Sequence, residues 1–468
     1  MAGPSDGSRF DRLSSADLTM MLTDRGQVPM NTGAILVFDR DGPSLAELRA
    51  LLTDRVATVP RLRQRVHRPP PGGGPPLWVD DPGFALERHL EGHELPPSAT
   101  LSGLLDLAAV LVGQRLTADR PPWRASAVTD PATGLVTALV LVVHHVMADG
   151  LGGLAVLSAL ADPGRPARSD GFPRPRPAFG DLALDAAACR VRSLTHLPAR
   201  LRLGVAGLRE LGAGRRRPSL AGTTSLTHRT SGRRRLSVVD VSLAEVVDTA
   251  HAVGGTVNDV VLAAIGGALM RLLERRGEEP SGVVVSVPIS GRASADPVHL
   301  GNQTGVRPIR VPLVADDCAR LDAVVGITRT AAGGSRASSS GPLGLAFRLL
   351  ARLGLFAWFV DRQRLVDTFE TNLRGPAEPL SFGGHRVRAI IPMALTPGNI
   401  GVSFDVLSYA GRLRITIVAD PDVVPELDLL GRLLAETLAR LIHEGRTDDS
   451  GTTSGRVPSA DATPSVAR

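Results

Sequence analysis

The sequence predicts a two-domain α/β protein in which strands alternate with helices along most of the chain. Three observations support this prediction. The 468 residues are enough for two ordinary hydrophobic cores, short β-rich apolar runs alternate with helix-like stretches, and a segment dense in proline and arginine at 163–180 interrupts the alternation. We expect an N-terminal domain over 1–162, a Pro/Arg-rich linker with a helix over 163–235, a C-terminal domain over 236–445 and a disordered tail over 446–468.

The first half begins with an expected strand at 34–39 and an expected helix at 44–56. Its most apolar run is TALVLVVHHVM at 137–147, which is short and β-rich and therefore predicts a buried central strand. A glycine-rich turn follows and enters a helix within 149–162. Two adjacent histidines and an aspartate thus lie at a strand-to-helix junction, where side chains are held rigidly beside a cleft.

The second half resumes the alternation with a strand-like stretch at 233–243, a helix at 256–277 and a strand at 282–290. The run NIGVSFDVLSYAGRLRITIVAD at 399–420 predicts a hairpin that turns at Ala410 and Gly411. An amphipathic helix follows it and ends near the predicted domain boundary. Interleaved strands and helices in both halves favour layered α/β domains.

Every basic residue in this chain is an arginine. Lys+Arg total 53 against 47 Asp+Glu, the net charge is +6, and the sequence contains no lysine. This excludes P-loop phosphate lysines, Schiff-base chemistry with pyridoxal phosphate, and biotin or lipoyl carriers. Aromatic residues make up 3% of the chain, too few for the stacking platforms that bind single-stranded nucleic acid, so we expect no nucleic-acid partner.

The cysteines and histidines offer no convincing metal site. Cys189 and Cys318 are far apart and form no CxxC pair, which argues against structural zinc and against a disulfide framework. His89, Glu91 and His93 spell HLEGH, but the glutamate has the wrong offset for the HExxH zinc motif. We therefore expect no metal.

The chain shows no targeting signal at its start, where the residues are polar, and no window of about twenty apolar residues without charge. We expect a cytoplasmic protein. The most lipophilic stretch, at 341–360, carries Arg348 and Arg352 on one helical face, and these arginines disfavour a spanning helix. Two interpretations stay open: a helix in a bilayer interface, or a buried helix beside an acyl pocket.

The strongest candidate site is the motif HHxxxDG, formed by His144, His145, Asp149 and Gly150. A neutral imidazole, with an ordinary pKa of about 6.5, can accept a proton from a hydroxyl near neutral pH. Neighbouring side chains on a strand point to opposite faces, so we expect one histidine to be structural. Gly150 lets the chain turn where a Cβ would clash. A purely structural alternative has both histidines bonded within the core and Asp149 capping the next helix.

HHVMADG resembles the active-site motif of the CoA-dependent acyltransferase superfamily, which includes chloramphenicol acetyltransferase, nonribosomal-peptide condensation domains and bacterial wax ester synthase/diacylglycerol acyltransferases. Further segments over about 10–445 resemble the last group, in its order. They are LSSADLTMMLTDRGQVPMNTGAILVFD at 13–39, PLWVDDPGFALERHL at 76–90, GGTVNDVVLAAIGGAL at 254–269, LGNQTG at 300–305, TNLRGP at 371–376 and VLSYAGRL at 406–413.

The resemblance implies two chloramphenicol-acetyltransferase-like domains, with mixed sheets flanked by helices and an active site at the domain interface. By position, it implies that His145 is the general base and that Asp149 is a structural aspartate. Asn258 and Asp259 match the family's ND motif, although Asp259 also closes a TxxD capping box, and both roles can hold. Three more residues are implied in substrate binding or structural support: Trp123, Asn302 and Asn372.

Two segments depart from the family's pattern. Where the family has PLW, this chain has PPW at 121–123, and Arg124 follows at a position where an acidic residue is common. These changes bear on acceptor selectivity rather than on the reaction class. The sequence TNLRGP replaces a more usual SNVPGP. Both departures leave the family resemblance in place.

The resemblance implies transfer of a fatty acyl group from acyl-CoA to diacylglycerol, to a long-chain fatty alcohol, or to both. Acyl-CoA would be a co-substrate, no cofactor would be bound, and the protein could lie at the periphery of a membrane or lipid droplet. Two alternatives stay open. One is a carrier-protein-dependent condensation or polyketide-ester acyltransferase, and the other is a catalytically silent lipid-surface binding protein.

Overall fold

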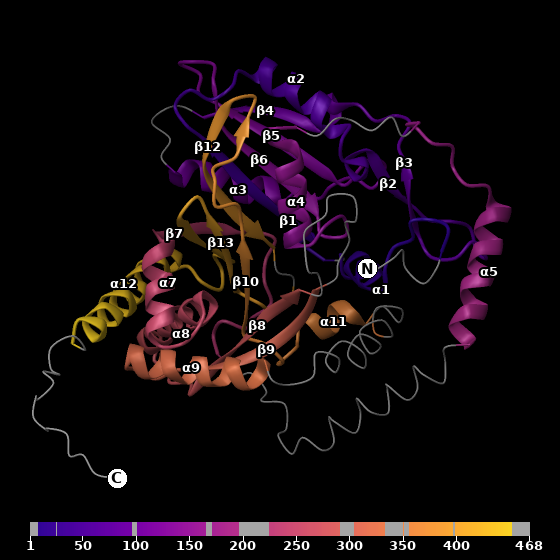
Figure 1. Ribbon diagram of the computed structural model, residues 1–468. Coiled ribbons are helices and arrows are strands. Elements are labelled where there is room, and N and C mark those ends of the chain that lie inside the picture. The colour runs from indigo at the N-terminus through magenta and orange to yellow at the C-terminus, as the bar shows by residue number, and fades with distance from the viewer. Residues whose placement is uncertain are drawn as a thin grey trace, which may run out of the picture.

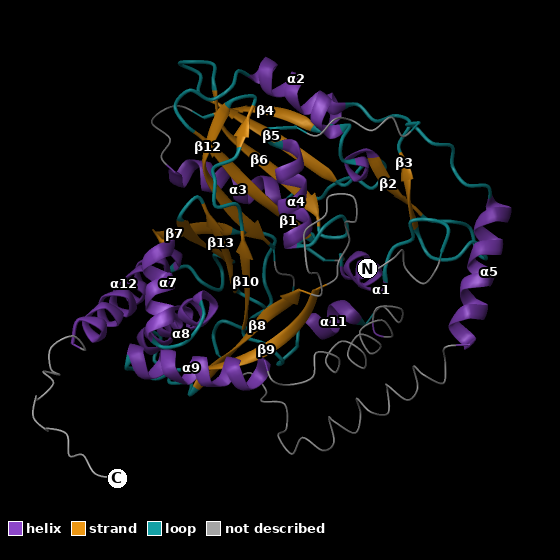
Figure 2. Ribbon diagram, viewed as in Figure 1, coloured by secondary structure: helices purple, strands orange, loops and turns teal. Residues whose placement is uncertain are grey.

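The computed structural model contains two six-stranded β-sheets with helices packed against them (Figure 1). Strands and helices interleave along the chain in both halves (Figure 2). The predicted α/β class, with mixed sheets flanked by helices, is confirmed. The structure describes residues 8–24, 26–95, 101–164, 171–195, 224–290, 304–332, 350, 355–395 and 398–451.

The first sheet draws strands from both halves of the chain. In spatial order it contains β11 (Ser381–Phe382), β12 (His385–Ala394), β1 (Asn31–Phe38), β6 (Val136–His144), β5 (Trp123–Thr129) and β4 (Leu90–Glu94). Neighbours are antiparallel except β4 and β5, which are parallel. Because β12 pairs with β1 along nearly its whole length, part of the predicted domain 236–445 completes the sheet of the N-terminal half. The predicted domain boundaries therefore do not coincide with the sheets.

The second sheet lies entirely within the second half. Its spatial order is β7 (Arg235–Ser242), β14 (Arg412–Ala419), β13 (Val402–Tyr409), β10 (Thr368–Arg374), β8 (Gly282–Ser290) and β9 (Thr304–Pro312). β10 is parallel to both of its neighbours, and the other pairs are antiparallel. The predicted hairpin is confirmed: β13 and β14 are joined at Ala410 and Gly411, whose φ angles of 48° and 77° fit a two-residue turn.

Helices occur throughout the described part of the chain, and several of them pack on the two sheets. They are α1 (Ser15–Thr23), α2 (Leu45–Val56), α3 (Leu101–Gly113), α4 (Gly150–Leu160), α5 (Phe179–Thr195), α7 (Leu243–Ala252), α8 (Val257–Arg275), α9 (Asp317–Ala332), α11 (Phe356–Val360) and α12 (Leu427–Gly451). A small hairpin of β2 (Gln64–His67) and β3 (Leu77–Asp80) and the 3-10 turns η2 (Pro60–Arg63) and η3 (Leu86–Arg88) complete the described elements.

Because successive side chains of a strand point to opposite faces, the two faces of the first sheet contribute to two different cores. Leu36 and Leu141 share one core with side chains of α2 and α4, whereas Ile35 and Val142 share the other with α3. The core under α3 also contains Leu236 and Val418 of the second sheet, so the halves are packed together there. α8, α12 and parts of α7 and α9 pack on the second sheet around a further core.

The single tyrosine links the halves a second time. The hydroxyl of Tyr409, on β13, donates to the carbonyl of Val387 on β12 at 2.8 Å and accepts the N–H of Leu380 at 2.7 Å. The ring is buried beside the core under α2 and α4. One buried side chain thus joins a strand of the second sheet to a strand of the first.

Two local expectations were wrong. Helix α5 begins at Phe179, inside the proline- and arginine-dense segment 163–180 that we expected to interrupt the alternation of strands and helices. Helix α12 runs to Gly451, so residues 446–451 are helical rather than part of a disordered tail, and 452–468 lie outside the described residues. The arginine triplet at 233–235 leads into β7: each arginine pairs with an aspartate, the side chains of Arg233 and Arg235 are 69% and 41% exposed, and Arg234 is buried against Asp420. The triplet at 215–217 lies outside the described residues.

No single helix in the described ranges has the length and apolar composition of a membrane span. The pair α7 and α8 meets those criteria together, by length and composition only, with a bend of 95° between the two helices. Most of α8 is buried in the core of the second half. The stretch 341–360 is described only at 350 and from 355 onward, so its predicted helix stays a prediction.

Candidate active site

His144 is the last residue of β6, and both nitrogens of its ring are engaged. Nδ1 accepts a hydrogen bond from the backbone N–H of Val146 at 3.0 Å, and Nε2 lies 3.3 Å from Oδ2 of Asp24. Because Nδ1 is an acceptor, the proton of the neutral ring sits on Nε2 and faces the carboxylate. His144 therefore has no lone pair left with which to take a proton from a substrate.

His145 follows the end of β6 and is partly exposed, whereas His144 is buried. The sheet register ends with the pair of Asn31 and His144. Beyond that pair, the backbone N–H of His145 donates to the carbonyl of Met30 at 2.8 Å. Of the two neighbouring imidazoles, the one at position 145 is thus the more open to an incoming molecule.

Asp149 and Gly150 form the start of α4. Oδ1 of the buried Asp149 accepts the N–H of Gly152 at 2.9 Å, which is the N-cap arrangement of the structural alternative. A Cβ added at Gly150 would lie 2.8 Å from Cδ1 of Leu373 on β10. Since a side chain there would collide with the second sheet, glycine permits the close approach of α4 and β10.

The ND segment contacts β10 one residue before Leu373. Asn372, next to Leu373 on β10, donates from Nδ2 to Oδ1 of Asn258 in the first turn of α8 at 2.9 Å. Oδ2 of Asp259 accepts the N–H and the hydroxyl of Thr256, each at 2.8 Å, and so completes the expected capping box. Asn258 therefore links two elements, while Asp259 holds its own helix.

Of the other predicted residues, Trp123 makes its hydrogen bond and ring contact within the core. Trp123 is buried, donates from Nε1 to the carbonyl of Leu62 at 2.7 Å and stacks on His89 at 4.5 Å between centroids. It packs the core beneath the sheet. Asn302 lies outside the described residues. Arg124, the departure from the family pattern, donates to the carbonyl of Leu111 near the C-terminal end of α3, where a cation is favourable.

The HLEGH segment has no metal-binding geometry. The ring of His89 is stacked between Phe84 and Trp123, and its Nδ1 lies 2.9 Å from the carbonyl oxygen of Trp123. His93 pairs with Glu91 at the sheet edge at 3.8 Å. Among the described residues, no group of three or more His, Cys, Asp or Glu side chains is placed to hold a metal ion.

Comparison with known proteins identifies the family. Residues 13–261 match the wax ester synthase/diacylglycerol acyltransferase catalytic domain, and residues 301–442 match the WS/DGAT C-terminal domain. The chain belongs to the wax ester synthase/diacylglycerol acyltransferase family. The predicted family resemblance is thereby confirmed, and with it the prediction of an acyl-CoA-dependent acyltransferase.

Named relatives and solved structures agree with this assignment. A probable diacylglycerol O-acyltransferase of Mycobacterium tuberculosis, tgs1, is 30% identical over 89% of this chain and 92% of its own, and a putative one of Mycobacterium bovis has the same values. The wax ester synthase/diacylglycerol acyltransferase of Marinobacter aquaeolei VT8 superposes with a TM-score of 0.66 at 21% identity, over 93% of this chain and 100% of that one. A condensation domain of the CDA synthetase shares the fold, with a TM-score of 0.57 at 18% identity, over 93% and 97% of the two chains.

This acyltransferase also buries three carboxyl groups on and beside β10. Burial and, as the smaller cause, the charge of Asp405 together raise the pKa of Glu370 to about 8. Burial likewise raises the pKa of Asp405 and of Asp367, each to about 6, against hydrogen bonds that lower them. Neither carboxylate oxygen of Glu370 has a hydrogen-bond partner in the described part of the structure. At neutral pH Glu370 is therefore mostly protonated.

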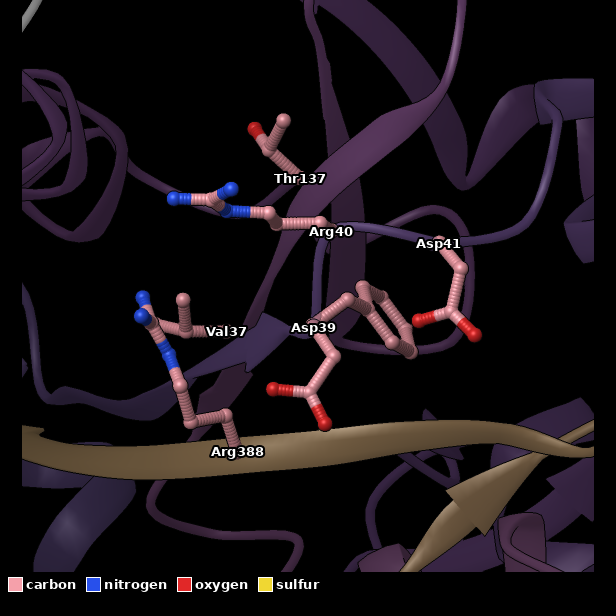
Figure 3. Close-up of a pocket in the computed structure, with 7 residues that line it drawn as sticks. Val37, Asp39, Arg40, Asp41, Thr137 and Arg388 are labelled. Carbon is pink, nitrogen blue, oxygen red and sulfur yellow. The ribbon is translucent and has the colours of Figure 1, made fainter.

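A pocket lies away from the histidines. It is lined by Val37, Phe38, Asp39, Arg40, Asp41, Thr137 and Arg388 (Figure 3). Val37 is six residues along β1 from Asn31, the register partner of His144, which separates the pocket from His144 by roughly 20 Å of strand. The pocket is at the opposite end of β1 and is not the candidate active site.

Sequence reasoning missed Asp24, Met30 and Leu373. Asp24 follows helix α1 and Leu373 lies inside the TNLRGP segment, so both sit in segments that resembled the family. Neither carries a pattern that singles it out, because their partners are far away in the sequence. Their roles became visible only when the fold brought these segments to His144 and Gly150.

Proposed function

We propose that this acyltransferase moves a fatty acyl group from acyl-CoA to the hydroxyl of diacylglycerol or of a long-chain alcohol, with His145 as general base. The observation that carries the proposal is the difference between two neighbouring imidazoles. Both ring nitrogens of His144 are engaged, whereas His145 is partly exposed just before the helix that contacts β10. The names of the relatives support diacylglycerol or an alcohol as acceptor.

In the proposed step, the acceptor oxygen attacks the carbonyl carbon of the thioester while His145 removes the hydroxyl proton. The tetrahedral intermediate then collapses, the carbon–sulfur bond breaks, and the proton passes from His145 to the leaving sulfur. The products are one ester and one free CoA thiol. Positioned proton transfer of this kind accelerates a reaction by about 10² to 10⁴, and the step needs neither a bound cofactor nor a metal.

The remaining motif residues receive positioning roles in this proposal. Asp149 and Gly150 shape the first turn of α4 and allow β10 to approach it. Asn258 and Asn372 tie α8 to β10 at the strand position next to Leu373. Together they hold the loop of His145 against the second half, which supports an active site at the interface between the halves.

We also propose that the protein contacts a lipid surface through α5. Its inner face is fastened to the body by a 2.8 Å ion pair between the buried Arg12 and Asp185. Its outer face exposes Leu184 and Val191, two turns apart, at 72% and 62% of their surface. Exposed apolar side chains of this kind are typical of helices that lie in a bilayer interface. Flotation with anionic vesicles tests this, with reduced binding expected for L184D/V191D.

The main test supplies the purified protein with palmitoyl-CoA and either hexadecanol or diacylglycerol, and records free thiol and neutral lipid together. The proposal expects thiol and ester in equal amounts with at least one acceptor. Ester formation from an acyl-carrier protein but not from acyl-CoA would favour the carrier-dependent alternative. Lipid binding with no ester from either donor would favour a silent lipid-surface protein.

The base assignment is tested by His145→Ala, which is expected to lower kcat by about 10² to 10⁴ while the unfolding transition stays in place. His93→Ala is the matched control. His93 lies at the sheet edge with 30% of its side chain exposed, so its loss is expected to leave turnover unchanged. Wild-type turnover in His145→Ala would overturn the role of His145.

A further inference from the structure

We infer that Asp24 is a positioning residue for acyl transfer, because its carboxylate fixes the backbone on both sides of the His145 side chain. The inference rests on the proposed role of His145 as general base. Asp24 does not touch the reacting atoms in this scheme. It acts through His144 and Met30, the two residues that bind the peptide groups of the turn.

The first route runs through the ring of His144. Oδ2 of Asp24 lies 3.3 Å from Nε2, and Nδ1 of the same ring accepts the N–H of Val146 at 3.0 Å. The imidazole thus bridges the carboxylate and the peptide that follows His145. Since an imidazole is rigid, fixing Nε2 also fixes the direction of the Nδ1 lone pair and the position of that peptide.

The second route runs through the backbone of Met30. Oδ1 of Asp24 accepts the N–H of Met30 at 3.1 Å, and the carbonyl of Met30 accepts the N–H of His145 at 2.8 Å. One carboxylate is therefore linked indirectly to two consecutive peptide N–H groups: to that of His145 through Met30, and to that of Val146 through His144. The two routes close a ring of interactions around the residue that must aim its imidazole at the substrate.

The sheet alone does not provide this restraint. The register of β1 and β6 ends at the pair of Asn31 and His144, so His145 lies one residue beyond the ladder. A turn bond from the N–H of Met147 to the carbonyl of His144, at 2.8 Å, closes the backbone after it. The contacts from Asp24 supply restraint at the point where the strand hydrogen bonds stop.

Asp24 is itself held in place and ionised. It follows α1, where its N–H donates to the carbonyl of Met20, and Nη1 of Arg115 donates to Oδ1 at 2.9 Å. Burial alone would raise the pKa of Asp24, but the hydrogen bond from His144, the N–H of Met30 and the charge of Arg115 lower it below its usual value. A negative charge is thus present to orient the ring.

The test is Asp24→Asn, which keeps the shape but turns one acceptor into an N–H₂ donor facing the Nε2 proton of His144. We expect kcat to fall about 10- to 100-fold, as is common for residues that orient a functional group, while KM for acyl-CoA changes less than threefold. The ¹⁵N signals of His144 should show loss of the Nε2-protonated tautomer. Asp41→Asn, an exposed aspartate at the other end of β1, is the matched control and should keep wild-type values.

A double-mutant cycle separates positioning from general damage. His144→Asn keeps a short acceptor for the N–H of Val146 but cannot reach Asp24. If Asp24 acts partly through His144, the double variant Asp24→Asn/His144→Asn loses less activity than the product of the two single losses. If Asp24→Asn fails to fold, His144→Asn alone carries the test and should show the same loss of kcat at little-changed KM.

The outcomes distinguish this inference from the proposed function. An inactive His145→Ala beside a fully active Asp24→Asn would overturn the inference and leave the base assignment intact. Strictly multiplicative losses in the double variant would also overturn the coupling through His144. A fully active His145→Ala would instead remove the proposed function on which the inference rests.

Discussion

The protein buries ionisable groups in two contrasting ways, at the end of β6 and in the middle of β10. At the end of β6, Asp24 and His144 face each other, and hydrogen bonds from Met30 and Arg115 also reach the carboxylate. On β10, Glu370 is fully buried and its oxygens have no hydrogen-bond partner among the described residues. The pKa of Asp24 is lowered and that of Glu370 is raised to about 8. Pairing, rather than burial alone, thus decides which acid stays charged.

The position of Glu370 explains its protonation. Alternate residues of β13, including Phe404 and Val406, lie in the core formed with α8 and α12, and Glu370 is the register partner of Phe404. Its side chain is therefore on the helix-covered side of the sheet, where a charged carboxylate costs far more than a neutral one. The charge of Asp405 adds to that cost. The comparison predicts that Glu370 on β10 lowers the free energy of unfolding at alkaline pH, whereas Asp24 at the end of β6 does not.

The largest effect is expected from pH acting on Glu370. The folded-state pKa is raised from 4.5 to about 8, so the folded protein keeps a proton that the unfolded chain has released. Stability from this group is fully present below pH 4.5 and is lost as the pH rises through 8. Between pH 6 and pH 9 we expect the free energy of unfolding to fall by roughly 3 kcal/mol from this group, measured by urea denaturation.

Glu370→Gln should remove most of that pH dependence, because the amide cannot ionise. Asp405 and Asp367, with pKa values near 6, titrate mainly below this window. Glu378→Gln, an exposed glutamate on the loop after β10, is the control and should keep the wild-type slope. Equal slopes for Glu370→Gln and the wild type would show that the contrast between the two regions is wrong.

The next largest effect is expected at the contact between the two regions. Gly150→Ala places a Cβ 2.8 Å from Cδ1 of Leu373, so the Leu373 side chain, α4 or β10 must shift, at about 1–3 kcal/mol by urea denaturation. Adding Leu373→Ala should recover part of the loss because it removes the colliding methyl groups. Gly153, where a Cβ would meet nothing within 4 Å, provides the control Gly153→Ala. Equal effects at both glycines would contradict a tight contact.

A smaller effect is expected from the cap of α4. Asp149→Ala removes the acceptor for the N–H of Gly152 and should lower stability by about 1 kcal/mol in the same measurement. Asp149→Asn keeps an acceptor and should lose only a few tenths of that. If the two variants are equally destabilised, the role of Asp149 is electrostatic rather than that of a cap.

The smallest effect is expected at Arg115, the exposed member of the Asp24 cluster. Its side chain is 46% exposed, so solvent and salt screen its pairing with Asp24. Arg115→Ala should cost less than about 1 kcal/mol, and the cost should shrink further in 1 M salt. A loss as large as that of Gly150→Ala would mean that the pairing at the end of β6 depends on Arg115 more than on His144.

Much of the local structure could be predicted from the sequence. The hairpin at Ala410 and Gly411, the capping box of Thr256 and Asp259, and the strand at 282–290 follow from turn residues, cap residues and apolar runs that act within a few positions. The central strand was also predicted, although it ends at His144 rather than at residue 147. That difference matters because it leaves His145 outside the ladder.

Other features could not be predicted because they join distant segments. β12 completes the first sheet by pairing with β1, although the two strands lie at opposite ends of the chain. Trp123 matched a family motif, yet its indole serves packing through Leu62 and His89. No local pattern marks either pairing, since strand register and buried contacts are decided by the whole set of neighbours.

The sequence by itself determined the α/β class, the family and the motif that places two histidines at a strand end, since periodicity and motif spacing are short-range properties of the chain. Only the tertiary structure decided that both ring nitrogens of His144 are engaged and which buried acid holds a proton. Those states depend on Asp24 approaching His144 and on Glu370 lying beside Asp405 without a partner. Electrostatic energies are set by distance and burial in space, which the order of residues does not specify.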